Sequence, residues 1–169
     1  MKRCAIAPSG TEACWELANP AMTDIPDYFL GEGNNDLTGT LKVGPAVKTI
    51  GTSAFANTKL TYLDLSEATS LVEIGESAFS ETNLAGTLVI PKTVTTIGNA
   101  AFYYTNLAGL DLSKATSLVE IGESAFSETN LAGTLSVPNT VTKIGAFAFY
   151  YTKLMGLDLS KATSLVEIG

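Results

Sequence analysis

The sequence predicts a solenoid of stacked coils rather than a globule with one closed core. The motif Ile-Gly-x-x-Ala-Phe occurs five times, and its isoleucines are separated alternately by 24 and 23 residues. A strict period in this range is typical of repeat proteins, in which each coil contacts only its neighbours. Large aliphatic residues spaced two apart in each coil add the signal of a short β-strand. The phenylalanines of the motif form the expected structural spine: Phe55, Phe79, Phe102, Phe126 and Phe149.

Two coil types alternate along the chain. The shorter type spans residues 74–96 and the longer type spans residues 97–120. Residues 74–120 and 121–167 are nearly the same sequence, so the repeating unit is a pair of coils, 47 residues long. Duplication of this pair is the simplest origin of the chain.

Each coil contains one predicted strand. In the longer type, Leu110 and Leu112 have the spacing of one strand face, so Asp111 between them points outward. In the shorter type, Val89 takes the outward position, and Pro91 ends the strand because it cannot donate to a ladder.

The rest of the coil is predicted from local spacing. Leu118 and Ile121 are three residues apart, which suits a tight or 3₁₀-like turn. The glycine after each isoleucine fits a left-handed or a crowded backbone position. The Ala-Phe pair is then expected to begin a short helical segment whose phenylalanine fills the coil interior.

Charge and composition exclude several function classes. The chain has 17 acidic and 10 basic residues and a net charge of −7, and Arg3 is its only arginine. Nucleic-acid binding needs clustered lysine and arginine, so it is not expected. The chain has no histidine, the commonest acid–base catalyst and metal ligand near neutral pH. No nucleophile–base pair, metal cluster or cofactor site is predicted.

Export and modification signals are few. No stretch approaches the length of a membrane span, and the basic start Met1-Lys2-Arg3 lacks a following apolar region. Either a signal was removed or the protein is not secreted by that route. No N-glycosylation sequon occurs, whereas O-linked sugars on threonine stay open. Cys4 and Cys14 either form a disulfide that closes a small loop or are two free thiols.

The repeat pattern resembles the BspA-like class of leucine-rich repeats. One form reads Leu-x-x-Leu-x-Leu followed by Leu-x-x-Ile-Gly-x-x-Ala-Phe, the other Leu-x-Ile-Pro-x-x-Val-x-x-Ile-Gly-x-x-Ala-Phe, over residues 37–169. The resemblance implies a right-handed parallel β superhelix with short or 3₁₀ helical segments opposite the sheet. It also implies a surface or secreted protein that binds host proteins, matrix or other cells, with no common catalytic residues.

The two ends depart from the repeat. Residues 1–24 are expected to form an N-terminal cap with a short helix at 11–18, and residues 25–169 the repeats, with a divergent first coil. The last motif stops at Gly169 without a cap. We therefore expect further repeats of a longer parent, another chain, or the next copy of this chain to cover that end.

Two outward surfaces are candidate binding sites. The first is the strand face, which either contacts a ligand or is merely a soluble sheet face. The second is an aromatic side wall, which either binds a partner or packs against its own coils. The strand face comprises Tyr62, Asp64, Val89, Asp111, Ser136 and Asp158. The aromatic side wall comprises Tyr103, Tyr104, Phe147, Tyr150 and Tyr151.

Threonines that recur once per coil, at 58, 82, 105, 129 and 152, are expected to satisfy backbone groups at the bend. The sequence as a whole predicts a non-enzymatic scaffold, at a cell surface or outside the cell, that binds a protein or a glycan-bearing partner. The alternative is a building block that stacks head to tail into a filament, sheath or layer.

Overall fold

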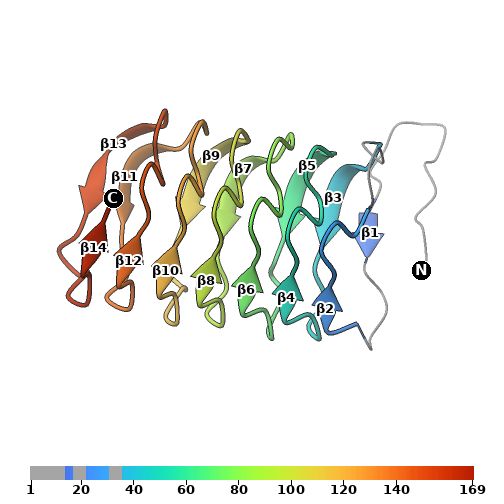
Figure 1. The fold of residues 1–169 in the computed structure, drawn as a ribbon, viewed down its shortest axis with the longest axis horizontal. Coiled ribbons are helices and arrows are strands. Elements are labelled where there is room, and N and C mark those ends of the chain that lie inside the picture. Colours follow the sequence, from blue (N-terminus) through green and yellow to red (C-terminus); the bar gives the residue numbers. More distant parts are fainter. Residues whose placement is uncertain (1–13, 17–21, 31–35) are drawn as a thin grey trace.

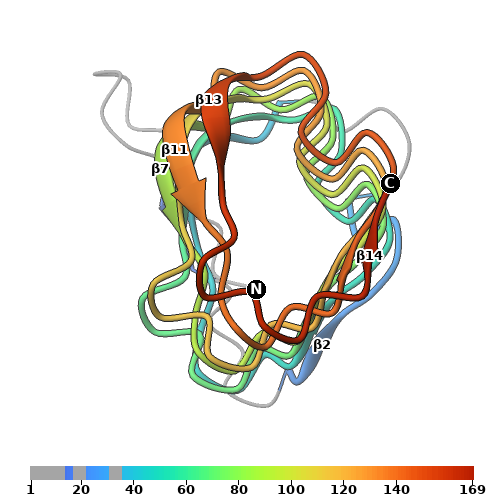
Figure 2. The ribbon, with the colours of Figure 1, turned by 90° about the vertical axis from the view of Figure 1, so that its left-hand side faces the viewer.

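The computed structural model describes residues 14–16, 22–30 and 36–169, and these residues form a parallel β-solenoid (Figure 1). Each complete coil contributes one short and one long strand. Figure 2 shows the two kinds of strand on opposite sides of the cross-section. None of the described residues is helical. No helix long and apolar enough to cross a membrane occurs in this part of the chain.

The short strands have two residues each and end at the repeating isoleucine. They form one seven-stranded parallel sheet, in which Ile121 lies between Ile97 and Ile144. The sequence predicted only a tight turn here, so these strands correct that prediction. The short strands are β2 (Asp24–Ile25), β4 (Thr49–Ile50), β6 (Glu73–Ile74), β8 (Thr96–Ile97), β10 (Glu120–Ile121), β12 (Lys143–Ile144) and β14 (Glu167–Ile168).

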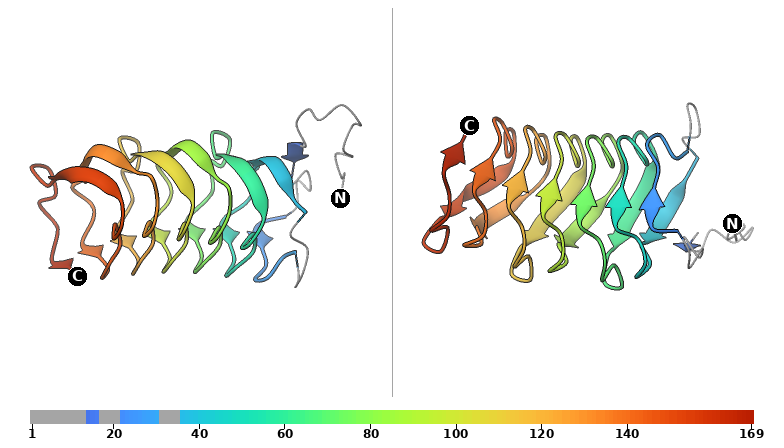
Figure 3. Two further views of the ribbon diagram at one scale, coloured as in Figure 1. Left: turned by 90° about the horizontal axis from the view of Figure 1, so that it is seen from above. Right: turned by 60° about the horizontal axis from the view of Figure 1, so that its bottom comes forward.

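The long strands lie on the opposite side of the coil, where each strand bends around its own coil (Figure 3). They join in parallel as β1-β3-β5, β7-β9 and β11-β13, and so form three small sheets. The register shifts by one residue between Gly86 and Thr87, and the φ of 79° at Gly86 is in the region that favours glycine. The long strands are β1 (Cys14–Glu16), β3 (Thr38–Lys42), β5 (Lys59–Asp64), β7 (Ala85–Val89), β9 (Asn106–Asp111), β11 (Ala132–Ser136) and β13 (Lys153–Asp158).

The helical segment expected at each Ala-Phe pair is wrong for the described residues, which form consecutive turns there. Ser77 and Glu81 have φ angles of 52° and 56°, which no right-handed helix contains. The N–H groups of Ser77, Phe79 and Glu81 donate to carbonyls of the next coil at 2.8 Å each. Every second backbone N–H of the bend thus donates to the next coil, so these groups are not available for the i→i−4 hydrogen bonds of an α-helix.

The repeating glycine is explained by crowding and not by a left-handed conformation. A Cβ added to Gly122 would lie 2.6 Å from the backbone N of Asn99 and the backbone C of Gly98. The equivalent glycines at 51, 75, 98 and 145 meet the preceding coil at comparable distances. Successive coils therefore touch backbone to backbone at this position, and any side chain would force them apart.

The phenylalanine spine lies inside the solenoid, as the sequence predicted. Phe55, Phe79, Phe102 and Phe126 are at most 1 % exposed, and neighbouring rings stack with centroids 5.2–5.4 Å apart. Phe149 continues the stack at 5.8 Å from Phe126. Leucines and isoleucines of both strand types complete a core that runs the length of the coils.

At the N-terminus the structure describes Cys14–Glu16 and residues 22–30. Cys14–Glu16, within the expected helix at 11–18, is instead strand β1 and pairs with β3. The backbone of this segment completes the ladder of β3, which a helix cannot do. Cys4 lies outside the described residues, so the predicted disulfide with Cys14 stays a prediction, as does most of the cap. Residues 22–30 continue the stack towards the N-terminus, since β2 pairs with β4 and the ring of Phe29 lies 5.8 Å from that of Phe55.

Candidate functional site

On the strand face, each candidate residue lies opposite one residue of the long strand with which its own strand pairs. Asp64 lies opposite Lys42, Val89 opposite Asp111, and Ser136 opposite Asp158. Neither β5 and β7 nor β9 and β11 share a ladder among the described strands. Tyr62 and Val89 are 46 % and 39 % exposed, so apolar as well as charged groups face outward here. The predicted outward orientation is confirmed, but the six residues do not form one continuous ladder.

The aspartates of the strand face also have a structural role. Asp64, Asp111 and Asp158 each accept a hydrogen bond from the backbone N–H of the serine two residues later, at 2.8–3.0 Å. The pKa of each carboxyl is held below its usual value, mainly by hydrogen bonding from the hydroxyl of this serine and secondly by the bond from its backbone N–H. Each aspartate thus closes the turn that follows its strand, while its charge remains on the surface.

The aromatic side wall consists of two separate clusters. Tyr103 and Tyr104 lie in the coil that begins at Ile97, with ring centroids 6.1 Å apart. Phe147, Tyr150 and Tyr151 lie two coils later. The ring of Tyr150 meets Phe147 edge-on at 5.6 Å and Tyr151 at 4.5 Å. These three side chains are 59 %, 51 % and 72 % exposed, so they form an exposed aromatic cluster.

The bend after each phenylalanine has the same construction in every complete coil. Tyr104 has a φ of 52°, and its N–H donates to the carbonyl of Ser127 in the next coil at 3.0 Å. Thr105, which follows, is buried and donates its hydroxyl to the carbonyl of Phe102 at 3.1 Å. The hydroxyls of Thr58, Thr82, Thr129 and Thr152 make the equivalent bond, which confirms the predicted role of these threonines.

Three successive bends enclose an open groove of about 360 Å³. Its walls are Glu81 and Asn83 from one coil, Tyr104 and Asn106 from the next, and Glu128 and Asn130 from the third. The buried threonines 82 and 105 form part of its lining. We call this site the bend groove. It joins one member of the predicted aromatic side wall, Tyr104, to five residues that sequence reasoning did not single out.

One carboxylate of the bend groove is held in place by a tyrosine. The Tyr103 hydroxyl donates to Oε1 of Glu128 at 3.0 Å, across the boundary between two coils. This hydrogen bond, together with the negative charge of Glu128, raises the pKa of the Tyr103 phenol above its ordinary value. Tyr103 therefore stays a neutral donor and orients the Glu128 carboxylate.

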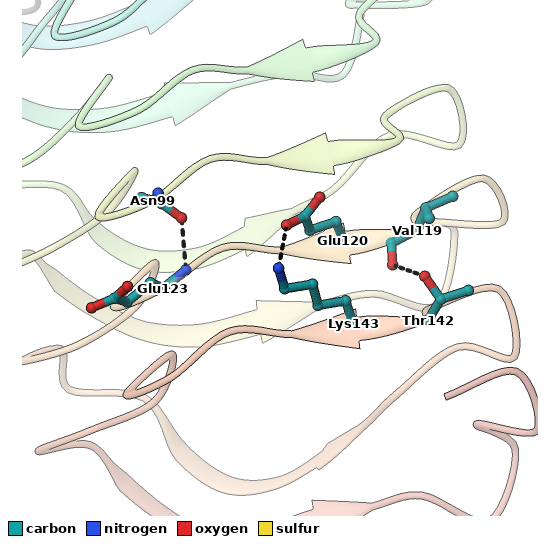
Figure 4. Close-up of polar contacts among 6 residues, drawn as sticks. All are labelled: Asn99, Val119, Glu120, Glu123, Thr142 and Lys143. Carbon is teal, nitrogen blue, oxygen red and sulfur yellow. Dashed lines mark hydrogen bonds and ion pairs between the residues drawn. The ribbon is translucent and has the colours of Figure 1, made fainter. Parts of the chain in front are cut away.

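The outer face of the seven-stranded sheet is occupied by contacts between coils (Figure 4). Lys143 Nζ lies 3.6 Å from Oε1 of Glu120, and the Thr142 hydroxyl donates to the Val119 carbonyl at 3.3 Å. The N–H of Glu123 donates to Asn99 Oδ1 at 2.9 Å. No group of three or more potential metal ligands occurs among the described residues. These contacts on the sheet side stabilise the stack of coils.

Comparison with known proteins agrees with this architecture. Residues 38–168 match the BspA type leucine rich repeat region in six copies. No curated protein matches the chain. A solved structure described as that of the pneumococcal vaccine antigen PcpA is similar, with a TM-score of 0.60 and 24 % sequence identity. The similarity covers 70 % of this chain and 30 % of that chain, so it concerns less than a third of the length of PcpA and describes the fold alone.

The family match extends over most of the chain and confirms the resemblance found in the repeat motifs. The chain belongs to the family of BspA-type leucine-rich repeat proteins.

Proposed function

We propose that this chain is a non-enzymatic binding scaffold, displayed at a cell surface or outside the cell, whose partner is a protein or a glycan-bearing surface. The exposed aromatic cluster of Phe147, Tyr150 and Tyr151 carries the proposal. Three rings that contact one another on the surface, each more than half exposed, are typical of an interaction site, because burying them on a partner releases a large apolar area.

Two other observations support the same function. The solenoid spreads outward side chains over several coils, which suits an extended contact with a macromolecule. The non-enzymatic part of the proposal is supported by the absence of histidine from the sequence. It is also supported by the outward aspartates, which already accept hydrogen bonds from the following serine. The description of PcpA as a vaccine antigen is in keeping with an exposed location for a relative of this fold.

The repeat itself supplies a conservative variant for the test. The coil of Ile121 carries Ser124, Ser127 and Glu128 where the coil of Ile144 carries Phe147, Tyr150 and Tyr151. The triple variant Phe147→Ser, Tyr150→Ser, Tyr151→Glu therefore introduces residues that this backbone already accommodates. Capture of intact cells, immobilised matrix proteins and glycans by the wild-type chain is compared with capture by this variant.

We expect the triple variant to lose capture at an unchanged melting temperature. A matched variant on the strand face, Asp111→Lys, measures the contribution of that surface separately. If both variants capture the partner as well as the wild-type chain does, neither the exposed aromatic cluster nor the strand face is a binding surface.

A second candidate function is end-to-end assembly into a filament or layer. It is favoured by the near identity of residues 74–120 and 121–167, because equal coils present matching donors and acceptors to one another. Light scattering over a range of protein concentrations tests it. Mass that rises with concentration supports assembly, and a constant monomer mass contradicts it for this chain.

A further inference from the structure

The bend groove has the size and openness of a small-ligand site. It holds about 360 Å³, at the lower end of the range of ligand pockets, and it is open to solvent. Three coils contribute to it, and the backbone of each bend is tied to the next coil by hydrogen bonds from Glu81 and Tyr104. The groove is therefore a rigid part of the solenoid.

The chemistry of its walls excludes several ligand classes. Carboxylates, amides, threonines and one tyrosine line the groove, and no lysine or arginine does. Phosphate and sulfate groups need cationic partners, so they are poorly matched. An apolar peptide is also poorly matched, because most of the lining side chains are polar.

Hydroxyl-rich ligands match this lining. A sugar hydroxyl both donates and accepts, and the amides of Asn83, Asn106 and Asn130 offer both kinds of group. Carboxylates accept the remaining hydroxyl protons in charge-assisted bonds. The Tyr104 ring, 60 % exposed, supplies an apolar face for the C–H side of a sugar ring.

The groove is also oriented for a linear ligand. Adjacent parallel strands are about 4.8 Å apart, so equivalent side chains of successive coils recur at about that interval. Glu81, Tyr104 and Glu128 occupy equivalent positions, two residues after the phenylalanine of their coil. A pyranose unit with its glycosidic oxygen has a similar length, so an oligosaccharide along the solenoid axis places one unit on each coil.

Flanking charges argue against a cationic ligand. The position four residues after the phenylalanine is asparagine in the three coils of the groove, and it is Lys59 and Lys153 in the coils on either side. Both lysines are exposed. Lys59 is paired with Asp36 at 3.4 Å, so Lys153 is the flanking positive charge that would repel a lysine-rich peptide along the same axis, whereas it would not repel a neutral sugar.

We propose that the bend groove formed by Glu81, Asn83, Tyr104, Asn106, Glu128 and Asn130 binds a neutral linear oligosaccharide. This inference rests on the proposed binding function and specifies its ligand at a site distinct from the exposed aromatic cluster. Tyr104 stacks on a sugar ring, and Glu128, oriented by Tyr103 through Oε1, accepts a sugar hydroxyl with its second carboxylate oxygen.

The experiment uses the full chain and a panel of neutral oligosaccharides of two to six units, made of glucose, N-acetylglucosamine, mannose or xylose. Binding is measured by saturation-transfer NMR and titration. We expect at least one series to bind, and Tyr104→Ala and Glu128→Gln each to weaken it by about tenfold. Tyr28→Ala, at an exposed tyrosine outside the groove, and Glu123→Gln, at an exposed glutamate on the side of the seven-stranded sheet, should leave the affinity unchanged.

Three results would overturn the proposal. The first is a panel in which no series binds. The second is binding that Tyr104→Ala and Glu128→Gln leave unchanged. The third is binding of a lysine-rich peptide that Glu81→Gln and Glu128→Gln abolish while no sugar competes. Because the triple variant of the exposed aromatic cluster leaves the bend groove intact, loss of capture in that variant supports the scaffold function even when the groove binds no sugar.

Discussion

The rings of Phe79 and Phe102 lie nearly parallel, with centroids 5.4 Å apart and an interplanar angle of 8°. Both side chains are fully buried, and each is covered by a ring from the coil on either side. Parallel stacked rings are one of the favoured aromatic geometries. The phenylalanine spine therefore couples each coil to its two neighbours through one continuous column.

Removing one ring from the middle of this column should destabilise the whole stack. For Phe102→Ala we expect the free energy of unfolding to fall by about 3–5 kcal/mol. The substitution leaves a cavity between two neighbouring rings, which are held by their own coils and cannot close it. Urea unfolding followed by circular dichroism measures this change. Phe147→Ala, at a surface phenylalanine two coils away, should change it by less than about 0.5 kcal/mol. Equal losses in the two variants would contradict the column.

The buried threonine of the bend should be replaceable only by a hydroxyl residue. Thr105→Val keeps the shape but leaves the carbonyl of Phe102 without its hydroxyl donor, so we expect a loss of about 1–3 kcal/mol. Thr105→Ser retains the donor and should lose less than half as much. Thermal unfolding of the two variants measures the difference, and a serine variant as unstable as the valine variant would show that the methyl group and not the hydrogen bond matters.

Stability should decline in acid through the outward aspartates. The pKa of Asp64, Asp111 and Asp158 is lowered in the folded chain, so each carboxylate stabilises the fold above its unfolded pKa of about 3.9. This contribution is lost as the pH falls below about 4 through the lower folded pKa values. Urea midpoints between pH 7 and pH 2.5 test the prediction.

The asparagine variant separates charge from hydrogen bonding at the same turn. Asp111→Asn keeps an oxygen that accepts from the N–H of Ser113 but cannot titrate, so its midpoint should fall less steeply with acid than that of the wild type. An acid profile that is identical in Asp111→Asn and the wild type would assign the pH dependence to other groups.

The repeating elements were predictable because their signals lie in the spacing within one coil and in the recurrence of the same residues from coil to coil. The spacing of Leu110 and Leu112 predicted the strand and the outward position of Asp111, and the recurrence of Phe102 predicted its burial. Thr105 was also predicted correctly, since a recurring small hydroxyl next to a turn has few other uses.

Other features depend on contacts between coils, which no single coil reveals. The helix expected at Ala-Phe is replaced by turns, because the bend donors pair with the next coil. Strand β10 has only two residues, too few for an alternating pattern, and it exists because Ile121 lies between equivalent isoleucines. The bend groove was not predicted, because Glu81, Tyr104 and Glu128 come together only through stacking. Their recurrence two residues after each phenylalanine was the signal that could have revealed them.

Successive coils touch backbone to backbone at the glycine after each isoleucine. Gly122 and Gly156 test this contact most directly, because a Cβ at Gly122 meets the preceding coil at 2.6 Å, whereas a Cβ at Gly156 meets nothing within 4 Å. In urea unfolding, Gly122→Ala should lose about 3 kcal/mol or more, and Gly156→Ala should be unchanged or more stable by up to about 1 kcal/mol. Equal stability of the two alanine variants would contradict the stacking described for these coils.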